Sequence, residues 1–475
     1  MYMYKNFFDD VTNKYLVSNC YNLQWNKKQA FLTKIQRKIY VLALRGEVSR
    51  VTRLQKIIIS SLNVKLLVVN SITSETRYNV SNITKVKIAL LLTSRPNPDL
   101  PLFWKKLNSS ISYLQFFTLY NRSIQYLIQL SFEPQWEAYL EPHIFGSRAK
   151  FIAKDAVLHL SQQIQSNYFN YAIISRFSLE LKPSHQKLLC KKIHTCHILN
   201  RLLISQIQYV YLVEPNFPRR KYLNLSDLLL NILLYGLQYC LIENTLLNTF
   251  DNQKPSKDFK RTIFYINYTN TLSILCQTEK VAEWLKYLLK SFFAAISLKA
   301  EVDIVCLSDQ NFEIDFLNFV LQKTNNDFNL LPNVKNKKQI IYDIRGLLYK
   351  KDFIGRRRAL SHLSLEKAIR KVNPYLLYWN NYYSICTQFN DLASLDQVIN
   401  NTIYRWQIKK YKRNKVSNWT KQCTKYVNSE KRISQGREIL ILLTKQRKNR
   451  RNHIPLISYR SSYDYDINYW RLRNT

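Results

Sequence analysis

The sequence predicts an α+β protein in which helices and strands alternate before a helical, strongly basic C-terminal third. Three observations carry this prediction: helical amphipathic periodicity in residues 22–70, a β-hairpin pattern in residues 263–276, and a helical pattern rich in Lys and Arg from residue 334 onward. The chain has 475 residues, 46% of them hydrophobic, so it is long enough for two or three packed units.

Residues 22–70 predict two amphipathic helices, with Gly46 in the usual position just after the first helix ends. Apolar side chains such as Ile35, Ile39, Val51 and Ile58 are expected to face inward, and Lys and Arg to line the outside. Basic helices of this kind are more often solvated faces than RNA contacts, so this segment alone does not separate the two interpretations.

The central region predicts a mixture of strands and helices. Residues 76–110 are irregular, with prolines at 96, 98 and 101 marking loops, and residues 111–139 are expected to form a strand and a helix. Mixed α/β signals continue to about residue 325. Within them, residues 263–276 hold two apolar runs around a polar tip at 267–271, which predicts a β-hairpin.

The charge balance points to a polyanionic partner. Lys and Arg number 71 against 32 Asp and Glu, a formal net charge of +39, which favours nucleic acid first and an anionic membrane surface second. A spanning helix needs roughly 20 apolar residues. The best stretch, 228–242, is shorter and contains Asn231 and Gln238, so a buried core helix is expected.

The C-terminal tail concentrates this charge. Residues 401–475 hold 19 Lys and Arg against 4 acids. Aromatic residues are interleaved there, a mixture that suits phosphate pairing with base stacking: Tyr404, Trp406, Tyr411, Trp419 and Tyr426. A core aromatic stripe flanked by solvated charge is the alternative interpretation.

The eight cysteines form no close CxxC pair, which excludes a zinc knuckle and a disulfide framework. Cys190, His194, Cys196 and His197 are a candidate metal cluster, but a basic amphipathic helix opening near Pro183 explains the same spacing. The N-terminus shows no import or secretion pattern. Heavy use of Asn, Lys, Ile and Tyr suggests an AT-rich organelle genome, and we expect a plastid rather than a mitochondrial location.

Residues 132–160, FEPQWEAYLEPHIFGSRAKFIAKDAVLHL, closely resemble the group II intron reverse transcriptase and maturase family, whose pattern there is approximately LEPxWEAxFxxxSYGFRPxRSxHDA. The matching residues are Glu133, Pro134, Trp136, Glu137, Ala138, Gly146, Arg148, Asp155 and Ala156. Other stretches agree with the family in the same order: residues 114–130, which keep Thr118, Arg122 and Gln125, then 226–238 and 314–320.

Residues 368–427 resemble the family's maturase-specific thumb, also called domain X. The matching landmarks are Asn373, Pro374, Trp379, Tyr382, Tyr383, Leu395, Asp396, Trp406 and Trp419. Residues 453–470 are similar to the segment that leads into the DNA-binding and endonuclease modules of longer members. This chain stops five residues after Trp470, so no endonuclease module is expected.

The resemblance implies a right-hand reverse-transcriptase-like fingers and palm, followed by an all-α thumb and a basic tail. We expect a basic helical extension at 1–75, degenerate fingers and palm at 76–330, the thumb at 331–430 and the tail at 431–475.

Several departures from the family concern polymerase chemistry. The family's YADD carboxylates hold two Mg²⁺ ions at a hairpin tip, but the corresponding residues here are Tyr268, Thr269, Asn270 and Thr271. The third ligand position, on the strand at 171–181, is Arg176, and only a register shift would bring in Glu180. The glycines of the family's PQGG nucleotide pocket are replaced in residues 220–223, which read RKYL.

These departures predict a maturase that binds its host intron RNA and assists splicing without polymerase activity. No protein-bound cofactor is expected, and Mg²⁺ is expected only with the intron RNA. An active RNA-directed DNA polymerase of a mobile intron is the enzymatic alternative, and a decaying mobile-element product without retained function is a third. The sequence leaves the target intron and the oligomeric state open, a dimer included.

No catalytic or metal-binding residues are assigned from the sequence. The residues expected to contact RNA are Arg45, Arg53, Arg122, Arg148, Lys409, Lys410, Lys412, Arg413, Tyr382, Tyr383 and Trp406.

Overall fold

The computed structural model describes residues 24–76, 80–92, 104, 112–148, 150–166, 168–178, 183–207, 225–247, 263–309, 311–324, 327–386, 390–411, 423–427, 430–446, 456–457, 460–464 and 466–474. The chain divides into two compact units that are not contiguous in sequence. Unit 1 comprises Met1–Ala153, Ile173–Ile304 and Leu456–Thr475, and unit 2 comprises Lys154–Ala172 and Val305–Pro455. Both contain helices and strands, as expected for an α+β protein.

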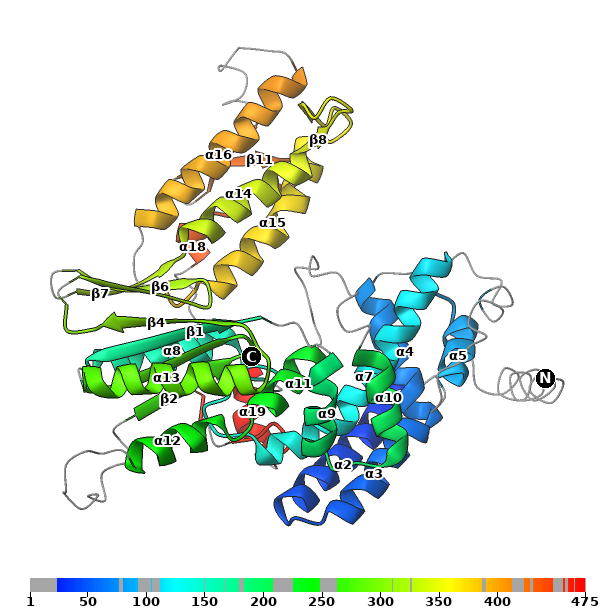
Figure 1. Ribbon diagram of the computed structural model, residues 1–475. Helices are drawn as coiled ribbons and strands as arrows, with labels where there is room; N and C mark the ends of the chain where they lie inside the picture. Colours follow the sequence, from blue (N-terminus) through cyan, green and yellow to red (C-terminus); the bar gives the residue numbers. More distant parts are fainter. Residues whose placement is uncertain are drawn as a thin grey trace. The chain divides into compact units, whose positions relative to one another are not determined.

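The N-terminal part of unit 1 is a group of helices packed around one long helix, α7 (Tyr113–Tyr139) (Figure 1). Helices α2 (Trp25–Leu44), α3 (Val48–Ser60) and α4 (Leu62–Thr76) contact α7, as does α10 (His197–Ile207), and α5 (Asn82–Leu91) packs on α4. The predicted second helix is therefore two helices, because the chain bends by 62° where α3 meets α4. Gly46 follows α2 with φ +74°, as predicted.

Helix α7 replaces the strand and helix expected in residues 111–139. It begins at a capping box formed by Ser112 and Gln115, and it continues through Pro134. Proline lacks the N–H that would bond the carbonyl four residues earlier, which belongs to Leu130. The Gln36 Nε2 of α2 donates to that carbonyl at 3.1 Å, and Gln55 Nε2 of α3 donates to the Ser131 carbonyl at 3.2 Å. The carbonyl left free by the proline thus provides a polar attachment point for α2.

The remainder of unit 1 is built on a four-stranded sheet of order β2-β3-β1-β4. Its strands are β1 (Tyr171–Phe177), β2 (Ile263–Tyr268), β3 (Thr271–Cys276) and β4 (Ala300–Cys306), and β2 pairs antiparallel with β3 as the sequence predicted. The accompanying helices are α9 (Pro183–Lys192), α11 (Leu225–Leu234), α12 (Leu237–Leu247), α13 (Glu279–Ala295) and α19 (Ile467–Asn474).

The apolar stretch at 228–242 forms α11 and α12 rather than one helix. Every residue of α11 from Leu228 to Leu234 is buried, which confirms a core helix there. Within the described part of the chain, Leu225–Glu243 is long and apolar enough to cross a membrane, with 56% of it buried inside the protein. The bent α3–α4 pair also qualifies if it is counted as one span.

Unit 2 combines helices with three small sheets. It contains α8 (Ala153–Gln165), the sheet β5 (Phe312–Phe316), β6 (Phe319–Thr324) and β7 (Asp327–Pro332), and the helices α14 (Val334–Leu348), α15 (Leu365–Tyr382) and α16 (Asn390–Tyr411). The other elements are the hairpin β8 (Tyr349–Lys351) and β9 (Arg357–Ala359), the sheet β10 (Thr424–Val427), β11 (Glu430–Gln435) and β12 (Glu438–Ile439), and α18 (Leu443–Gln446).

The prediction of an all-α region at 331–430 is wrong, because β8, β9 and β10 lie within it. The helices α14, α15 and α16 are present as expected, and α14 packs against both others. Strands β11 and β12 pack against α15, so part of the predicted tail belongs to this helical group. The N-terminal helices and residues 456–475 likewise fall in one unit with α7.

Candidate functional site

The β2–β3 hairpin occupies the place where the family carries its polymerase carboxylates. Its turn is formed by Thr269, with φ +49°, and Asn270, and Thr269 Oγ1 donates to Asn270 Oδ1 at 3.3 Å. The Phe177 amide at the end of β1 donates to the Asn270 carbonyl at 3.1 Å. Arg176, the residue before it, is exposed on β1. The two segments that the resemblance aligns with the family's metal-binding segments therefore meet at the hairpin tip.

Two further family motifs converge on this tip. The Phe145 amide donates to the Asn267 carbonyl at 2.8 Å, which places Gly146 directly against Thr269. A Cβ at Gly146 would collide with the Thr269 backbone nitrogen, so only glycine fits without a shift. Asn231 of α11 donates from Nδ2 to the Gly146 carbonyl at 2.5 Å. Gly146 and Asn231, which lie in the two segments that resemble the family, are thus in direct contact with the hairpin tip or with each other.

The residues at this tip do not fit a two-Mg²⁺ site. Such a site requires charged oxygen ligands, whereas Thr269, Asn270 and Thr271 supply neutral oxygens and Arg176 supplies a cation. Among the described residues there is no group of three or more His, Cys, Asp or Glu that could hold a metal ion. Glu180 and residues 220–223 lie outside the described residues.

Arg148 is a structural residue rather than a surface contact, so the structure corrects the expectation that it binds RNA. It is 3% exposed, and it donates from Nε and Nη2 to the two carboxylate oxygens of Glu137 at 3.0 and 2.9 Å. Its Nη1 donates to the carbonyls of Pro142 and Ile144 at 3.3 and 3.2 Å. The guanidinium also lies 4.0 Å from the centre of the Phe151 ring. RNA cannot reach this group while unit 1 remains folded.

A second buried carboxyl on α7 fixes the C-terminal segment of unit 1. The Tyr463 hydroxyl donates to Glu133 Oε1 at 2.9 Å, and the Tyr463 ring stacks on Tyr40 of α2 with 5.9 Å between ring centres. Burial raises the pKa of Glu133 to about 7. Trp470 donates from Nε1 to the Ser461 carbonyl at 2.7 Å, which closes this segment on itself. Residues 460–474 are therefore an integral part of unit 1.

The maturase-like landmarks of unit 2 hold the helical group together. Asn373 donates from Nδ2 to the Ile439 carbonyl at 2.9 Å and accepts from the Ile441 amide at 3.1 Å. Asp396 accepts from the Leu443 amide at 2.9 Å and from the Thr444 amide at 3.1 Å, which caps α18. These side chains join α15 and α16 to the strand and helix that follow them.

The aromatic landmarks of unit 2 belong mostly to its core, so the structure corrects the expectation that they stack on RNA. Trp406 is fully buried and Tyr383 is 4% exposed. Tyr382 is half-buried, stacks on Phe319 with 5.2 Å between ring centres, and donates from its hydroxyl to the Leu317 carbonyl at 3.0 Å. Among the interleaved aromatic residues of the tail, Trp406 thus fits the alternative of a core aromatic stripe, whereas Tyr426 is 76% exposed.

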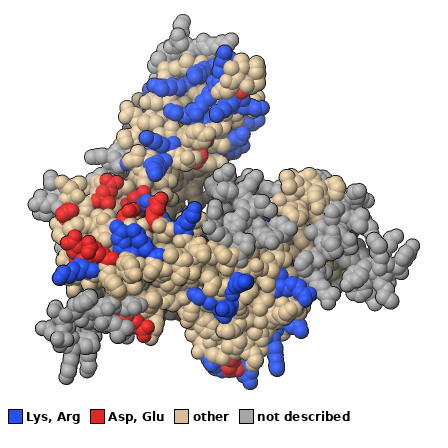
Figure 2. Space-filling model, viewed as in Figure 1, with Lys and Arg blue, Asp and Glu red and all other residues tan. Residues whose placement is uncertain are grey.

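The exposed cations of unit 2 gather on α14, α16 and the β8–β9 hairpin (Figure 2). Lys409 is exposed on α16, with its Nζ 5.7 Å from the centre of the Tyr349 ring on β8. Arg345 on α14 and Arg405 on α16 are exposed as well. Lys410 is half-buried and donates from Nζ to the Leu363 carbonyl at 2.6 Å. This hydrogen bond stabilises the fold of unit 2. Lys412 and Arg413 lie outside the described residues.

Unit 1 presents a second basic face. Arg45 and Arg53 are exposed, together with Lys34, Lys38 and Lys56 of the same helices, while Ile35, Ile39, Val51 and Ile58 are buried as predicted. Arg122 is half-buried on α7.

The prediction from the sequence missed the β8–β9 hairpin, which forms part of the basic surface on unit 2. The β8–β9 hairpin, residues 349–359, carries Arg356, Arg357 and Arg358, all exposed, and a nearly fully exposed Phe353. The available signal was the Asp-Phe-Ile-Gly stretch at 352–355, whose aspartate and glycine are typical of a tight turn between strands. The hairpin was missed because the whole region from residue 334 onward was predicted to be helical.

The candidate metal cluster at 190–197 is not assembled. Helix α9 ends at Lys192 and α10 begins at His197, so the two cysteines and two histidines do not share one helical face.

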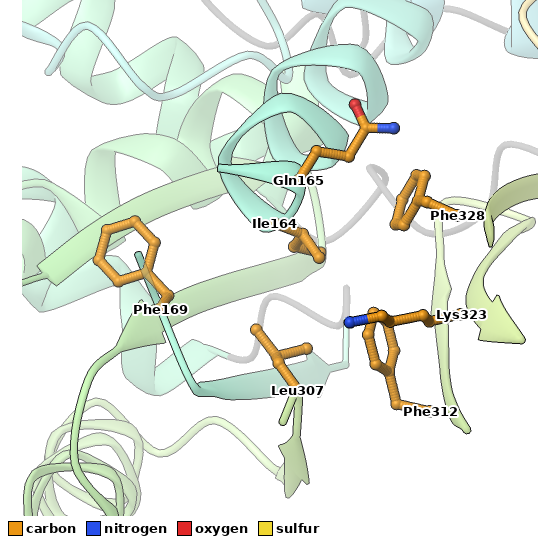
Figure 3. Close-up of a pocket in the computed structure, with 7 residues that line it drawn as sticks. All are labelled: Ile164, Gln165, Phe169, Leu307, Phe312, Lys323 and Phe328. Atoms are coloured by element: carbon orange, nitrogen blue, oxygen red, sulfur yellow. The ribbon is translucent and has the colours of Figure 1, made fainter. Parts of the chain in front are cut away.

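A hollow of about 540 Å³ in unit 2 lies between the end of α8 and the β5–β6–β7 sheet (Figure 3). Lys323 on the central strand pairs with Phe312 on one side and Phe328 on the other, so the three side chains form one cross-strand row. The remaining lining residues are Ile164, Gln165, Phe169 and Leu307. None of these seven carries a carboxylate, thiol or imidazole, so the hollow is suited to binding rather than to catalysis.

Comparison with known proteins yields two family matches. Residues 354–427 match the group II intron maturase-specific domain, and residues 21–91 match the N-terminal domain of reverse transcriptase. No curated protein matches the chain.

Among solved structures, the chain is similar to the telomerase of Candida albicans in complex with a fragment of telomeric RNA, with a TM-score of 0.30 and 8% identity. The alignment covers 67% of this chain and 56% of the telomerase chain.

The two family matches coincide with the helices around α7 and with the β9–α16 region of unit 2, and the motifs between them converge on a palm-like hairpin. These two matches support a member of the group II intron maturase and reverse transcriptase family.

Proposed function

We propose that this protein binds its host group II intron RNA and assists splicing without copying RNA. The observation that carries the proposal is the tip of the β2–β3 hairpin at 268–271, which carries threonine and asparagine at the positions that the resemblance aligns with the family's polymerase carboxylates. In this proposal the RNA supplies the splicing chemistry, and the protein stabilises the folded form of the intron.

Two kinds of surface support RNA binding. The exposed faces of α2 and α3 and the exposed face formed by α14, α16 and the β8–β9 hairpin are both rich in Lys and Arg. Structured RNA is recognised chiefly through phosphates and 2′-hydroxyl groups, which such faces can contact without reading a base sequence. On this basis Arg45, Arg53, Lys409, Lys412 and Arg413 remain the proposed contacts from the sequence, joined by Arg345 and Arg405.

The proposal is tested by measuring splicing of the host intron at a Mg²⁺ concentration too low for the RNA to splice alone. The purified chain should restore splicing, and its filter-binding affinity for the intron should fall steeply with salt, because each neutralised phosphate releases counterions. A variant with Arg345, Arg405 and Lys409 replaced by Ala should lose much of this activity. Lys280→Ala, Lys286→Ala and Lys290→Ala on α13 form a matched control, because they remove the same charge from a helix that also carries acids.

Failure of the parent chain to promote splicing, together with equal affinity for the intron and for unrelated RNA, would contradict the proposal.

A further inference from the structure

The β8–β9 hairpin presents a large aromatic ring to solvent at its tip. Phe353 is 97% exposed and its neighbour Ile354 is 57% exposed. Folding normally buries such a side chain, since a phenylalanine removed from water contributes roughly 1.5–3 kcal/mol. A ring held this far out makes no contribution to the core of unit 2, so its position requires another explanation.

The turn that carries Phe353 is held by a set of hydrogen bonds. Asp352 Oδ1 accepts from the amides of Ile354 and Arg356 at 3.1 and 2.7 Å, and Oδ2 accepts from Arg358 Nε at 3.1 Å. The Gly355 amide donates to the Asp352 carbonyl at 2.9 Å, with Gly355 at φ +83°, a conformation that favours glycine. The ring is therefore presented by a defined turn.

Cations surround the exposed ring. Lys350, Lys351, Arg356, Arg357 and Arg358 are all exposed, and Asp352 is the one acid between residues 349 and 359. In the register of the hairpin, Lys350 pairs with Arg358 and Lys351 with Arg357, so like charges lie directly opposite one another. Such pairs repel and destabilise a hairpin unless a polyanion neutralises them.

The hairpin is fixed to the helices of unit 2. The Arg357 guanidinium lies 5.8 Å from the centre of the Tyr342 ring on α14, and Lys409 of α16 lies beside Tyr349 on β8. The Leu360 amide after β9 donates to the Leu348 carbonyl at the end of α14, at 3.1 Å. The exposed ring and its cations thus continue the basic surface of α14 and α16.

We propose that Phe353 stacks on an unpaired base of the bound RNA, while the arginines and lysines of the hairpin pair with the adjacent phosphates. This inference rests on the proposed RNA-binding function and adds the kind of RNA element that is recognised. The combination of one planar ring and five cations matches how proteins hold splayed-out bases, by stacking together with phosphate contacts. A protein partner would instead favour a broader apolar patch with fewer like charges.

The experiment uses the full chain and two probes: a short RNA hairpin with one bulged nucleotide, and the same hairpin without the bulge. Phe353→Ala should weaken binding of the bulged RNA by about 5- to 150-fold, the range for loss of one stacked base. Binding of the fully paired RNA should be unchanged. Phe353→Trp should retain the preference for the bulge, and Phe353→Leu should lose it. Tyr287→Ala, at a tyrosine on α13 that is 63% exposed, is the matched control and should behave as the parent chain.

Each remaining outcome overturns the inference in a distinguishable way. If Phe353→Ala binds both RNAs like the parent, stacking by Phe353 is excluded while RNA binding stands. If Phe353→Leu equals the parent, the side chain acts as an apolar contact, and a protein partner becomes the better explanation. If the parent binds neither RNA, this inference fails, whereas the proposed function is decided separately by the splicing assay on the host intron. Because Phe353 is almost fully exposed, these variants should keep the parent's circular dichroism spectrum and melting temperature.

Discussion

The buried pair between Arg148 and Glu137 gives the sharpest prediction about stability. Arg148→Met removes four hydrogen bonds and leaves the Glu137 carboxylate, which is 1% exposed, without its counter-charge. Removing one partner of a buried ion pair costs about 3–5 kcal/mol. The unfolding midpoint in urea, followed by tryptophan fluorescence, should fall accordingly.

The double variant Glu137→Leu with Arg148→Met should recover much of this loss. It leaves no charge buried, and replacing a whole buried pair with apolar side chains is often neutral or stabilising. The carbonyls of Pro142 and Ile144 still lose their donor, so recovery should be incomplete. If Arg148→Met unfolds at the parent's midpoint but binds RNA more weakly, Arg148 is an RNA contact and the structural assignment is refuted.

Three further predictions concern other parts of the chain. Because the pKa of Glu133 is raised to about 7, the contribution of this residue to the free energy of unfolding is fully present below pH 4.5 and is lost as the pH rises through about 7. The free energy of unfolding should fall by about 3 kcal/mol over this range. Thermal melts between pH 5 and 8 should show this decline in the parent and a flatter profile in Glu133→Gln, and identical profiles would count against a proton bound at Glu133. Asp396→Ala should lower the stability of unit 2 by about 1–3 kcal/mol, because the α18 amides lose their acceptor, and an unchanged melting temperature would show that the cap contributes nothing. Replacing Arg345, Arg405 and Lys409 by Ala should reduce the slope of log Kd against log salt by about one per phosphate contact, whereas an unchanged slope would place the RNA elsewhere.

The sequence predicted well those features that depend on local pattern. The β2–β3 hairpin was predicted from two apolar runs around a polar tip, and its pairing from Ile263 to Cys276 follows that pattern. Gly46 follows the end of α2 as expected, and α11 is buried from Leu228 to Leu234. In these segments, periodicity and turn chemistry determine the structure with little help from distant residues.

Features that depend on distant partners were missed. Residues 111–139 were predicted to form a strand and a helix, but α7 is one helix that continues through Pro134. Gln36 of α2 bonds the carbonyl that the proline leaves without a partner within the helix. Trp406 and Tyr383 looked suitable for stacking on RNA because a sequence does not reveal which face of a basic, aromatic helix packs inward. Arg148 was predicted to contact RNA as a basic residue, and the sequence does not reveal that its guanidinium pairs with Glu137 of α7.

The region around the β2–β3 hairpin tip differs both from the locally determined segments and from the features that were missed. Its motifs were recognised one by one along the chain, and the structure brings Gly146, Asn231 and the Thr269–Asn270 turn into direct contact. Steric and hydrogen-bonding requirements of the backbone therefore persist although the metal-binding carboxylates are absent from the tip.

Primer extension on an RNA template, with the purified chain and either Mg²⁺ or Mn²⁺, tests the central claim most directly. We predict no template-directed nucleotide incorporation under conditions in which the same preparation binds intron RNA. Incorporation that depends on the template and is abolished by replacing Thr269 and Asn270 would contradict the account, because it would mean that this hairpin tip still organises a polymerase site.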